Sequence, residues 1–172
     1  MNKELTLILI ILSLLFACGN NSILGDNKKR PGIQDLEGLN RYMVEKDRER
    51  IESYIERKGL KMEESPLGLW YGTIFEGEGD TIKSNDRVTF EYICALLDGT
   101  VCYTSEELGK KEVIVGKGDI EAGLDAGLRL MKGGGEANFI LPPYLAFGLK
   151  GDGKRIPSRS VVVYWIKIVS VN

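Results

Sequence analysis

The sequence predicts an α+β fold, in which an antiparallel sheet packs against one short helix and a longer helix precedes both. From residue 67 onward, short runs of β-branched and aromatic residues alternate with Gly, Asp and Pro, a pattern typical of strands joined by tight turns. The chain holds 21 glycines in 172 residues, about 12% where ~7% is usual, and this excess favours sheet and turns over a helical bundle.

The composition excludes several kinds of active site. The chain has no histidine, so it cannot form a Ser-His-Asp triad, a Cys-His dyad or a histidine-ligated zinc site. The three cysteines, Cys18, Cys94 and Cys102, are too scattered in the sequence to suggest a metal site. A net charge of −2 argues against bulk electrostatic binding to nucleic acid. We therefore expect no metal, no cofactor and no nucleic-acid partner.

The N-terminus has the pattern of an export signal. A lysine at position 3 precedes an apolar run over residues 5–16, which is too short to span about 30 Å of hydrocarbon. The run ends in Leu15-Phe16-Ala17-Cys18, which resembles the bacterial lipobox. That resemblance implies cleavage after residue 17 and lipid attachment at Cys18, where several acyl chains together anchor a protein stably. The alternatives are an ordinary secretory signal with a chance cysteine and an uncleaved anchor.

Residues 18–38 are rich in Gly, Asn and charge, which predicts a flexible tether. Lys28, Lys29 and Arg30 either add attraction to anionic head groups or form a solvated basic stretch. This arrangement places the protein in the cell envelope, held to a membrane by its N-terminal lipid and facing the periplasm. Gly19 is not acidic, which slightly favours the outer membrane over the inner one.

The spacing predicts a helix over residues 40–58, which contain no Gly or Pro. Asn40 can cap its start, and Gly59 follows its end. Six apolar residues fall on one side at helical spacing: Leu39, Tyr42, Met43, Ile51, Tyr54 and Ile55. Asp47 interrupts this stripe, so we expect the helix to pack by its two ends and carry charge in the middle. It either docks on its own domain, serves as a spacer or binds a partner.

The predicted strands cover residues 67–75, 88–97, 100–104, 112–115, 136–141 and 161–171. Residues 77–80 read as a turn, and Asp98-Gly99 suits a type I′ hairpin turn. The one helical interval among the strands spans residues 122–131, where apolar residues recur at i, i+4 and i+7. With a two-residue turn, Ala95 would face Cys102 and Cys94 would face Tyr103. The two cysteines would then point to opposite faces, unless a bulge intervenes, and a disulfide between them is not expected.

Several motifs of the C-terminal half occur in the order found in one enzyme family. They are VTFEY at 88–92, LDGT at 97–100, VGKG at 115–118, IEAGLDAGL at 120–128, LPPYLAFG at 141–148 and IP at 156–157. In this order they resemble an FKBP-type peptidyl-prolyl cis-trans isomerase domain. With the lipobox and the helix over 40–58, the whole chain is similar to the FKBP-type lipoproteins associated with gliding motility.

The resemblance implies a bent antiparallel sheet wrapped around the short helix, with the active pocket between them. It divides the chain into a lipoprotein signal peptide over 1–17, a tether over 18–38, an N-terminal helical segment over 39–66 and an isomerase domain over 67–172. It also implies a monomer that acts on proline-containing segments of envelope proteins. Isomerising an X-Pro bond breaks no covalent bond and moves no proton, so a chain without histidine can catalyse it.

The resemblance further assigns site residues. Tyr92 and Ile120 match the family's pocket tyrosine and aliphatic wall, and Glu121 stands where a backbone N–H meets a ligand carbonyl. Leu124 replaces a tryptophan on the pocket floor, Phe147 a tyrosine and Tyr164 a phenylalanine, completing the predicted catalytic set. The predicted substrate-binding residues are Cys102, Tyr103 and Ile156, and either Lys111 or Glu112 falls where a further aromatic is expected.

Three of these positions depart from the family pattern in a way that bears on activity. Cys102 replaces a phenylalanine, Tyr103 replaces an aspartate, and Phe147 lacks the hydroxyl that bonds a ligand. A neutral hydrogen bond is worth about 0.5–1.5 kcal/mol. Two functions therefore stay open: a lipid-anchored prolyl isomerase, and an FKBP-scaffold binding module or chaperone, with weak or no isomerase activity, that serves a motility or secretion complex.

Overall fold

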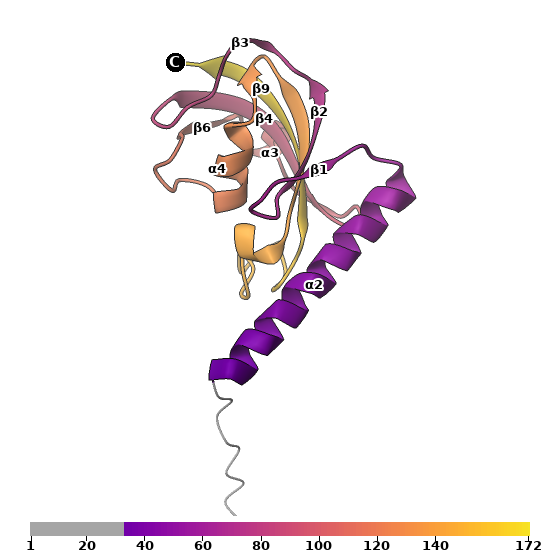
Figure 1. The fold of residues 1–172 in the computed structure, drawn as a ribbon. Helices are drawn as coiled ribbons and strands as arrows, with labels where there is room; N and C mark the ends of the chain where they lie inside the picture. The colour runs from indigo at the N-terminus through magenta and orange to yellow at the C-terminus, as the bar shows by residue number, and fades with distance from the viewer. Residues whose placement is uncertain (1–32) are drawn as a thin grey trace, which may run out of the picture. The chain divides into compact units, whose positions relative to one another are not determined.

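A seven-stranded antiparallel sheet forms the centre of the fold (Figure 1). The structure is a computed structural model that describes residues 33–172. The predicted signal peptide, Cys18 and the tether up to residue 32 lie outside these residues. The chain divides into two units, residues 1–36 and 37–172, and the sheet belongs to the second.

The strands of the main sheet lie in the order β1-β2-β8-β9-β4-β5, and β6 pairs with β4. Their bounds are β1 Glu63–Glu64, β2 Trp70–Phe75, β4 Arg87–Leu96, β5 Val101–Thr104, β6 Lys111–Ile114, β8 Glu136–Leu141 and β9 Val162–Val171. A second sheet pairs β3 Glu78–Thr81 with β7 Lys132–Gly133. The helical elements are α2 Ile33–Lys58, α3 Ser105–Leu108, α4 Ala122–Leu128 and the 3₁₀ turn η1 Pro143–Leu145.

The predicted fold class is confirmed, with α4 in the hollow of the bent sheet (Figure 1). Residues 78–80, predicted as part of a turn, instead belong to β3, because β7 pairs with this strand. Helix α3 was not predicted. It is a single turn capped by Thr104, whose Oγ1 accepts a hydrogen bond from the Glu107 N–H at 3.1 Å.

Side chains that alternate along β8 separate two apolar clusters. Phe139 and Leu141 lie in the main core with Leu124 of α4, and all three side chains are buried. Ile140 points to the other face, where it packs with Ile51 of α2 and Val161. Helices α4 and α2 therefore cover opposite faces of the same strand.

Helix α2 differs from its prediction at its N-terminal end. It begins at Ile33 rather than Asn40, so residues 33–38 are helical and not part of a flexible tether. A helical Gly38 costs only about 0.5–1 kcal/mol relative to Ala. At the other end the helix stops at Lys58 as predicted, and Gly59 has φ 61°.

The apolar stripe on α2 packs by one end only. Ile51 is buried, with Tyr54 and Ile55 half-buried beside it, whereas Leu39 and Tyr42 are 53% and 61% exposed. Charge does lie in the middle of the helix, and one of the charged side chains there, that of Asp47, is buried. Asp47 is 4% exposed and pairs with Arg159 at 2.7 Å between Oδ2 and a guanidinium nitrogen.

The β4–β5 hairpin has a longer turn than expected. The Leu96 N–H donates to the Thr100 carbonyl, so three residues form the loop, and Gly99 has φ 92°. Cys94 pairs with Tyr103 as predicted, but Ala95 pairs with Val101, and Cys102 occupies the resulting bulge. This bulge is the condition under which the two cysteines are not expected to face opposite ways. Both are buried in the main core with free thiols.

Close helix–sheet packing requires glycine in α4. A Cβ at position 127 would lie 2.9 Å from Cε1 of Phe139, a spacing that real Cβ atoms essentially never show. We expect Gly127→Ala to destabilise the fold by about 1–3 kcal/mol despite alanine's better helix propensity. Gly38→Ala in α2 is the matched control, because a Cβ there meets nothing within 4 Å. Urea unfolding should show opposite signs for the two variants; a stabilised Gly127→Ala protein would contradict this packing.

Burial should make the two core cysteines unreactive. Burial raises the pKa of the Cys94 thiol to about 12 and also raises the pKa of Cys102. At pH 8 the thiolate fraction at a pKa near 12 is about 1 in 10,000. We expect iodoacetamide to leave both unlabelled in the native protein and to label both in urea, as read by peptide mass spectrometry. Rapid native labelling of Cys94 would show that β4 opens locally.

Candidate active site

A cleft of about 300 Å³ opens beside the sheet, where β4, β5 and β9 meet the start of α4 and the loop after η1. Four of its nine lining residues are aromatic, four are charged and one is leucine. They are Tyr92, Tyr103, Phe147, Tyr164, Lys111, Glu121, Asp152, Lys154 and Leu108. Five of the predicted site residues, Tyr92, Tyr103, Glu121, Phe147 and Tyr164, are thus brought together around one space.

Two neighbouring strands supply the tyrosine wall. Tyr92 lies on β4 two residues before Cys94, and Cys94 pairs with Tyr164 on β9, so both tyrosines point to the same face. The rings of Tyr92 and Phe90 pack in a T-shaped arrangement, with 6.2 Å between their centroids. Burial raises the pKa of both phenols, and the nearby Glu121 carboxylate adds to the rise. Both hydroxyls therefore stay protonated and can donate a hydrogen bond.

The opposite wall is a loop organised by one carboxylate. Asp152 Oδ1 accepts hydrogen bonds from the N–H groups of Lys154 and Ile156, each at 2.8 Å, and Oδ2 accepts one from the Tyr103 hydroxyl. Burial acts to raise the pKa of Asp152, but these hydrogen bonds outweigh it and lower the pKa overall. The hydrogen bond to Asp152 in turn raises the pKa of Tyr103. Tyr103, which replaces the family's aspartate, is therefore hydrogen-bonded to a different aspartate, Asp152 of the loop.

Glu121 occupies the N-cap position of α4, and its carbonyl accepts the Asp125 N–H at 2.9 Å. Its backbone N–H has no acceptor among residues 33–172, so it is available to a ligand carbonyl. The side chain also faces the cleft, and its Oε2 is buried without a hydrogen-bond partner in the described part of the chain. Position 121 thus offers a donor from the backbone and an acceptor from the side chain.

The other predicted residues lie behind the cleft or beside it. Leu124, Cys102 and Ile156 are 1%, 1% and 2% exposed, and they belong to the main core. Ile120 is half-buried and packs against that core. None of the four is among the residues that line the cleft. They support the walls from beneath in this structure, and their contact with a substrate stays a prediction.

Sequence reasoning missed three of the lining residues: Leu108, Asp152 and Lys154. Leu108 ends the unpredicted helix α3, and the other two belong to an irregular loop with no periodic pattern to place them. Of the two positions where a further aromatic is expected, Lys111 lines the cleft, whereas Glu112 pairs with Arg87 at 2.6 Å. Lys111 and Lys154 have no ion-pair partner among the described residues, so the rim carries unpaired positive charge.

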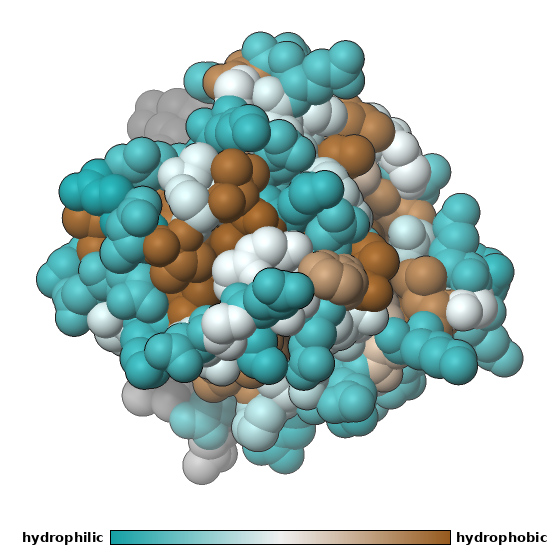
Figure 2. Space-filling model, turned by 90° about the horizontal axis from the view of Figure 1, so that it is seen from above, coloured by the Kyte–Doolittle hydropathy of each residue, from teal (hydrophilic) through white to brown (hydrophobic). Residues whose placement is uncertain are grey.

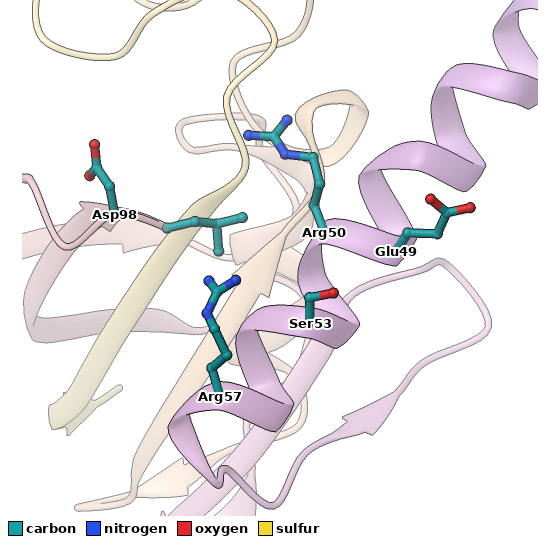
Figure 3. Close-up of a pocket in the computed structure, with 6 residues that line it drawn as sticks. Glu49, Arg50, Ser53, Arg57 and Asp98 are labelled. Carbon is teal, nitrogen blue, oxygen red and sulfur yellow. The ribbon is translucent and has the colours of Figure 1, made fainter.

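A second hollow, of about 470 Å³, lies between α2 and the β4–β5 turn (Figure 3). Arg50 and Arg57 extend toward it from α2 (Figure 3), and Leu97 and Asp98 line it from the β4–β5 turn. No aromatic residue lines it and most of its lining residues are charged, so it offers no apolar surface to bind a proline ring. We therefore take the smaller aromatic cleft as the candidate active site.

The surface of the described residues is mixed in polarity. On the face seen in Figure 2, apolar side chains gather in patches separated by hydrophilic ones. No helix within residues 33–172 is long and apolar enough to cross a membrane. In the same range, Cys, Asp and Glu side chains form no group of three or more that could hold a metal ion.

Comparison with known sequences identifies the family. Residues 79–169 match the FKBP-type peptidyl-prolyl cis-trans isomerase family. A Haemophilus influenzae protein named "Probable FKBP-type peptidyl-prolyl cis-trans isomerase" is 35% identical over 115 residues, covering 67% of this chain and 47% of that protein. Its Neisseria meningitidis counterpart FkpA is 31% identical over 127 residues, covering 73% and 46%. The chain thus spans about half the length of these curated relatives.

Solved structures agree in fold. The crystal structure of AtFKBP13 is 26% identical, with a TM-score of 0.62, and the match covers 65% of this chain and 99% of that one. FkpA from Escherichia coli is 23% identical, with a TM-score of 0.65, covering 100% of this chain and 83% of that one. The matched residues 79–169 include every residue that lines the aromatic cleft. The chain therefore belongs to the FKBP-type peptidyl-prolyl cis-trans isomerase family.

Proposed function

We propose that the protein is a peptidyl-prolyl cis-trans isomerase that uses the aromatic cleft. The observation that carries this proposal is that Tyr92, Phe147 and Tyr164 form apolar walls around the same space that the free Glu121 N–H borders. Family membership supports the same activity. A proline ring needs apolar walls, and the preceding carbonyl needs a donor.

The reaction requires shape and desolvation rather than acid–base chemistry. Rotation about an X-Pro bond has a barrier of about 18–20 kcal/mol, which amide resonance sets. The twisted amide has lost that resonance and is less polar than either planar form, so a water-poor aromatic cleft favours it. The Glu121 N–H holds a substrate carbonyl while the proline ring stays between the tyrosine wall and Phe147. Each of these contacts lowers the barrier only if it is stronger in the twisted state.

The cellular role of this activity follows from the N-terminal sequence. The lipobox-like segment ending at Cys18 supports a lipid anchor, and the basic tether supports contact with a membrane surface. We propose that the protein is a monomer in the cell envelope that faces the periplasm, with the outer membrane slightly favoured over the inner one. Its substrates are then proline-containing segments of envelope proteins during folding or assembly.

A second function is favoured by the polarity of the cleft. Four of the nine lining residues are charged, and Asp152 ties Tyr103 into a hydrogen bond that a substrate cannot use. A cleft with these features suits a binding module or chaperone with weak isomerase activity, accessory to a motility or secretion complex. The measurement that separates the two functions is the rate of isomerisation itself.

We expect the purified full chain to accelerate cis-trans exchange in a short X-Pro peptide, measured by NMR exchange spectroscopy. Tyr92→Ala should lower kcat/KM by about tenfold to a hundredfold, since removing an aromatic wall forfeits roughly 1.5–3 kcal/mol of apolar contact. Tyr42→Ala is the matched control, because Tyr42 is 61% exposed on α2 and should not matter. No acceleration by the wild-type chain at high concentration would favour the binding module. Full activity in Tyr92→Ala would show that the site is elsewhere.

The rate of isomerisation should be nearly independent of pH between about 5.5 and 8. Burial raises the pKa of Tyr92 and Tyr164, and the hydrogen bond to Asp152 raises that of Tyr103, so all three stay neutral in this range. The pKa of Asp152 is lowered, so its stabilisation of the loop is complete above about pH 5 and is lost only as pH falls through the folded pKa. A bell-shaped kcat/KM profile would reveal acid–base chemistry in the cleft.

A further inference from the structure

We infer that helix α2 contributes to isomerase activity by positioning one wall of the cleft. That wall is the loop over residues 148–160, and the buried Asp47 of α2 holds it through an ion pair with Arg159. The role assigned to the loop rests on the proposed function. Asp47 lies outside residues 79–169, which match the family, so the family comparison does not assign it any role.

The ion pair is the most buried one on α2. The side chain of Asp47 is 6% exposed and that of Arg159 is 27% exposed, and their atoms approach to 2.7 Å. The same guanidinium lies 3.5 Å from the carbonyl of Met43, one helical turn earlier. By contrast, the Lys46–Glu49 pair on the same helix has both side chains about half exposed. Buried pairs are screened little by water and salt, whereas exposed pairs contribute little to stability.

Arg159 also closes the base of the loop through its backbone. Its N–H donates to the Gly148 carbonyl at 3.1 Å, which joins the two ends of the loop. Its φ is 54°, in the left-handed region that a residue with a long side chain rarely adopts. Such a conformation persists only where the surroundings hold it, and the ion pair to Asp47 supplies that hold.

The loop that this pair anchors carries much of the cleft wall. Phe147 precedes it directly, and Asp152 and Lys154 lie within it. On its other side, Arg155 makes a bidentate pair with Glu107 at 2.6 Å and donates to the Cys102 carbonyl at 2.8 Å. The loop is therefore held between α3–β5 on one side and α2 on the other. Its exit is fixed as well, since Val161 packs against Ile51 of α2.

The geometry has a functional consequence. A wall displaced by about 1 Å can reduce catalysis by up to a hundredfold even when no residue in contact with substrate has changed. Asp47 and Arg159 are then positioning residues, and any event that moves α2 also loosens the cleft. A helix that served only as a spacer would leave the loop unaffected when the ion pair is lost.

The test breaks the pair from each side in the full chain. Asp47→Asn removes the negative charge that pairs with Arg159. Arg159→Asn removes the guanidinium but keeps a residue type that tolerates the left-handed backbone. We expect both variants to lower kcat/KM for an X-Pro peptide by about tenfold or more. Amide hydrogen exchange should quicken at least about tenfold at Ile156 and Arg159 in the loop, while the amides of Ile93 and Ile166 in β4 and β9 keep their wild-type rates.

Glu49→Gln is the matched control, because it removes an exposed ion pair two residues from Asp47 and should change neither measurement. Asp47→Glu, which retains the charge, should restore most of the loop protection lost in Asp47→Asn. Unchanged loop exchange in both asparagine variants, or exchange that quickens equally across the sheet, would overturn the inference. A wild-type chain without isomerase activity would refute the proposed function, and the exchange measurements would still decide whether α2 holds the loop.

Discussion

The packing of α4 into the hollow of the sheet is the constraint on which the site depends. Gly123 and Gly127 allow the helix to touch Leu141 and Phe139 without an intervening Cβ. Because α4 sits this close, its first turn places Glu121 beside Tyr164, where β9 borders the cleft. A helix held further away would leave the backbone N–H of Glu121 out of reach of a ligand that contacts the tyrosine wall. The apolar packing of α4 on the sheet thus determines where the Glu121 N–H can donate to a ligand.

The second wall is held by a different kind of interaction. The loop over 148–160 has little apolar burial apart from Ile156, and it takes its shape from the Asp152 carboxylate and from Arg159. Removing one partner of a buried ion pair costs about 3–5 kcal/mol, because it leaves an uncompensated charge. Apolar packing therefore holds the sheet side of the cleft, whereas the hydrogen bonds and ion pairs of a few charged residues hold the loop side. Movement on substrate binding belongs on the loop side.

The sequence predicts the parts that repeat a local pattern and not the parts that depend on distant partners. The β-branched and aromatic runs predict β4 and β9, and the glycine after Lys58 predicts the end of α2. The resemblance to the family, rather than the strand pattern, is what singles out Tyr92 and Tyr164 on those strands. The bulge at Cys102 was not predictable, since it depends on how the three-residue turn at Leu97 resolves. The burial of Asp47 is not predictable for the same reason, because its partner Arg159 lies 112 residues away.

The departures from the family pattern become understandable once the contacts are seen. Tyr103 stands where an aspartate is expected, but its hydroxyl donates to Asp152 of the loop, so the cleft wall has a carboxylate at this place from another part of the chain. Cys102 is smaller than the expected phenylalanine and is buried beneath the wall, where it contacts the Arg155 carbonyl at 3.6 Å. A reaction that needs walls and one donor, rather than a fixed chemical group, tolerates such exchanges provided that the loop stays in place. The identity of the wall residues is therefore less constrained than the interactions that hold the wall, and for this site those interactions extend to α2.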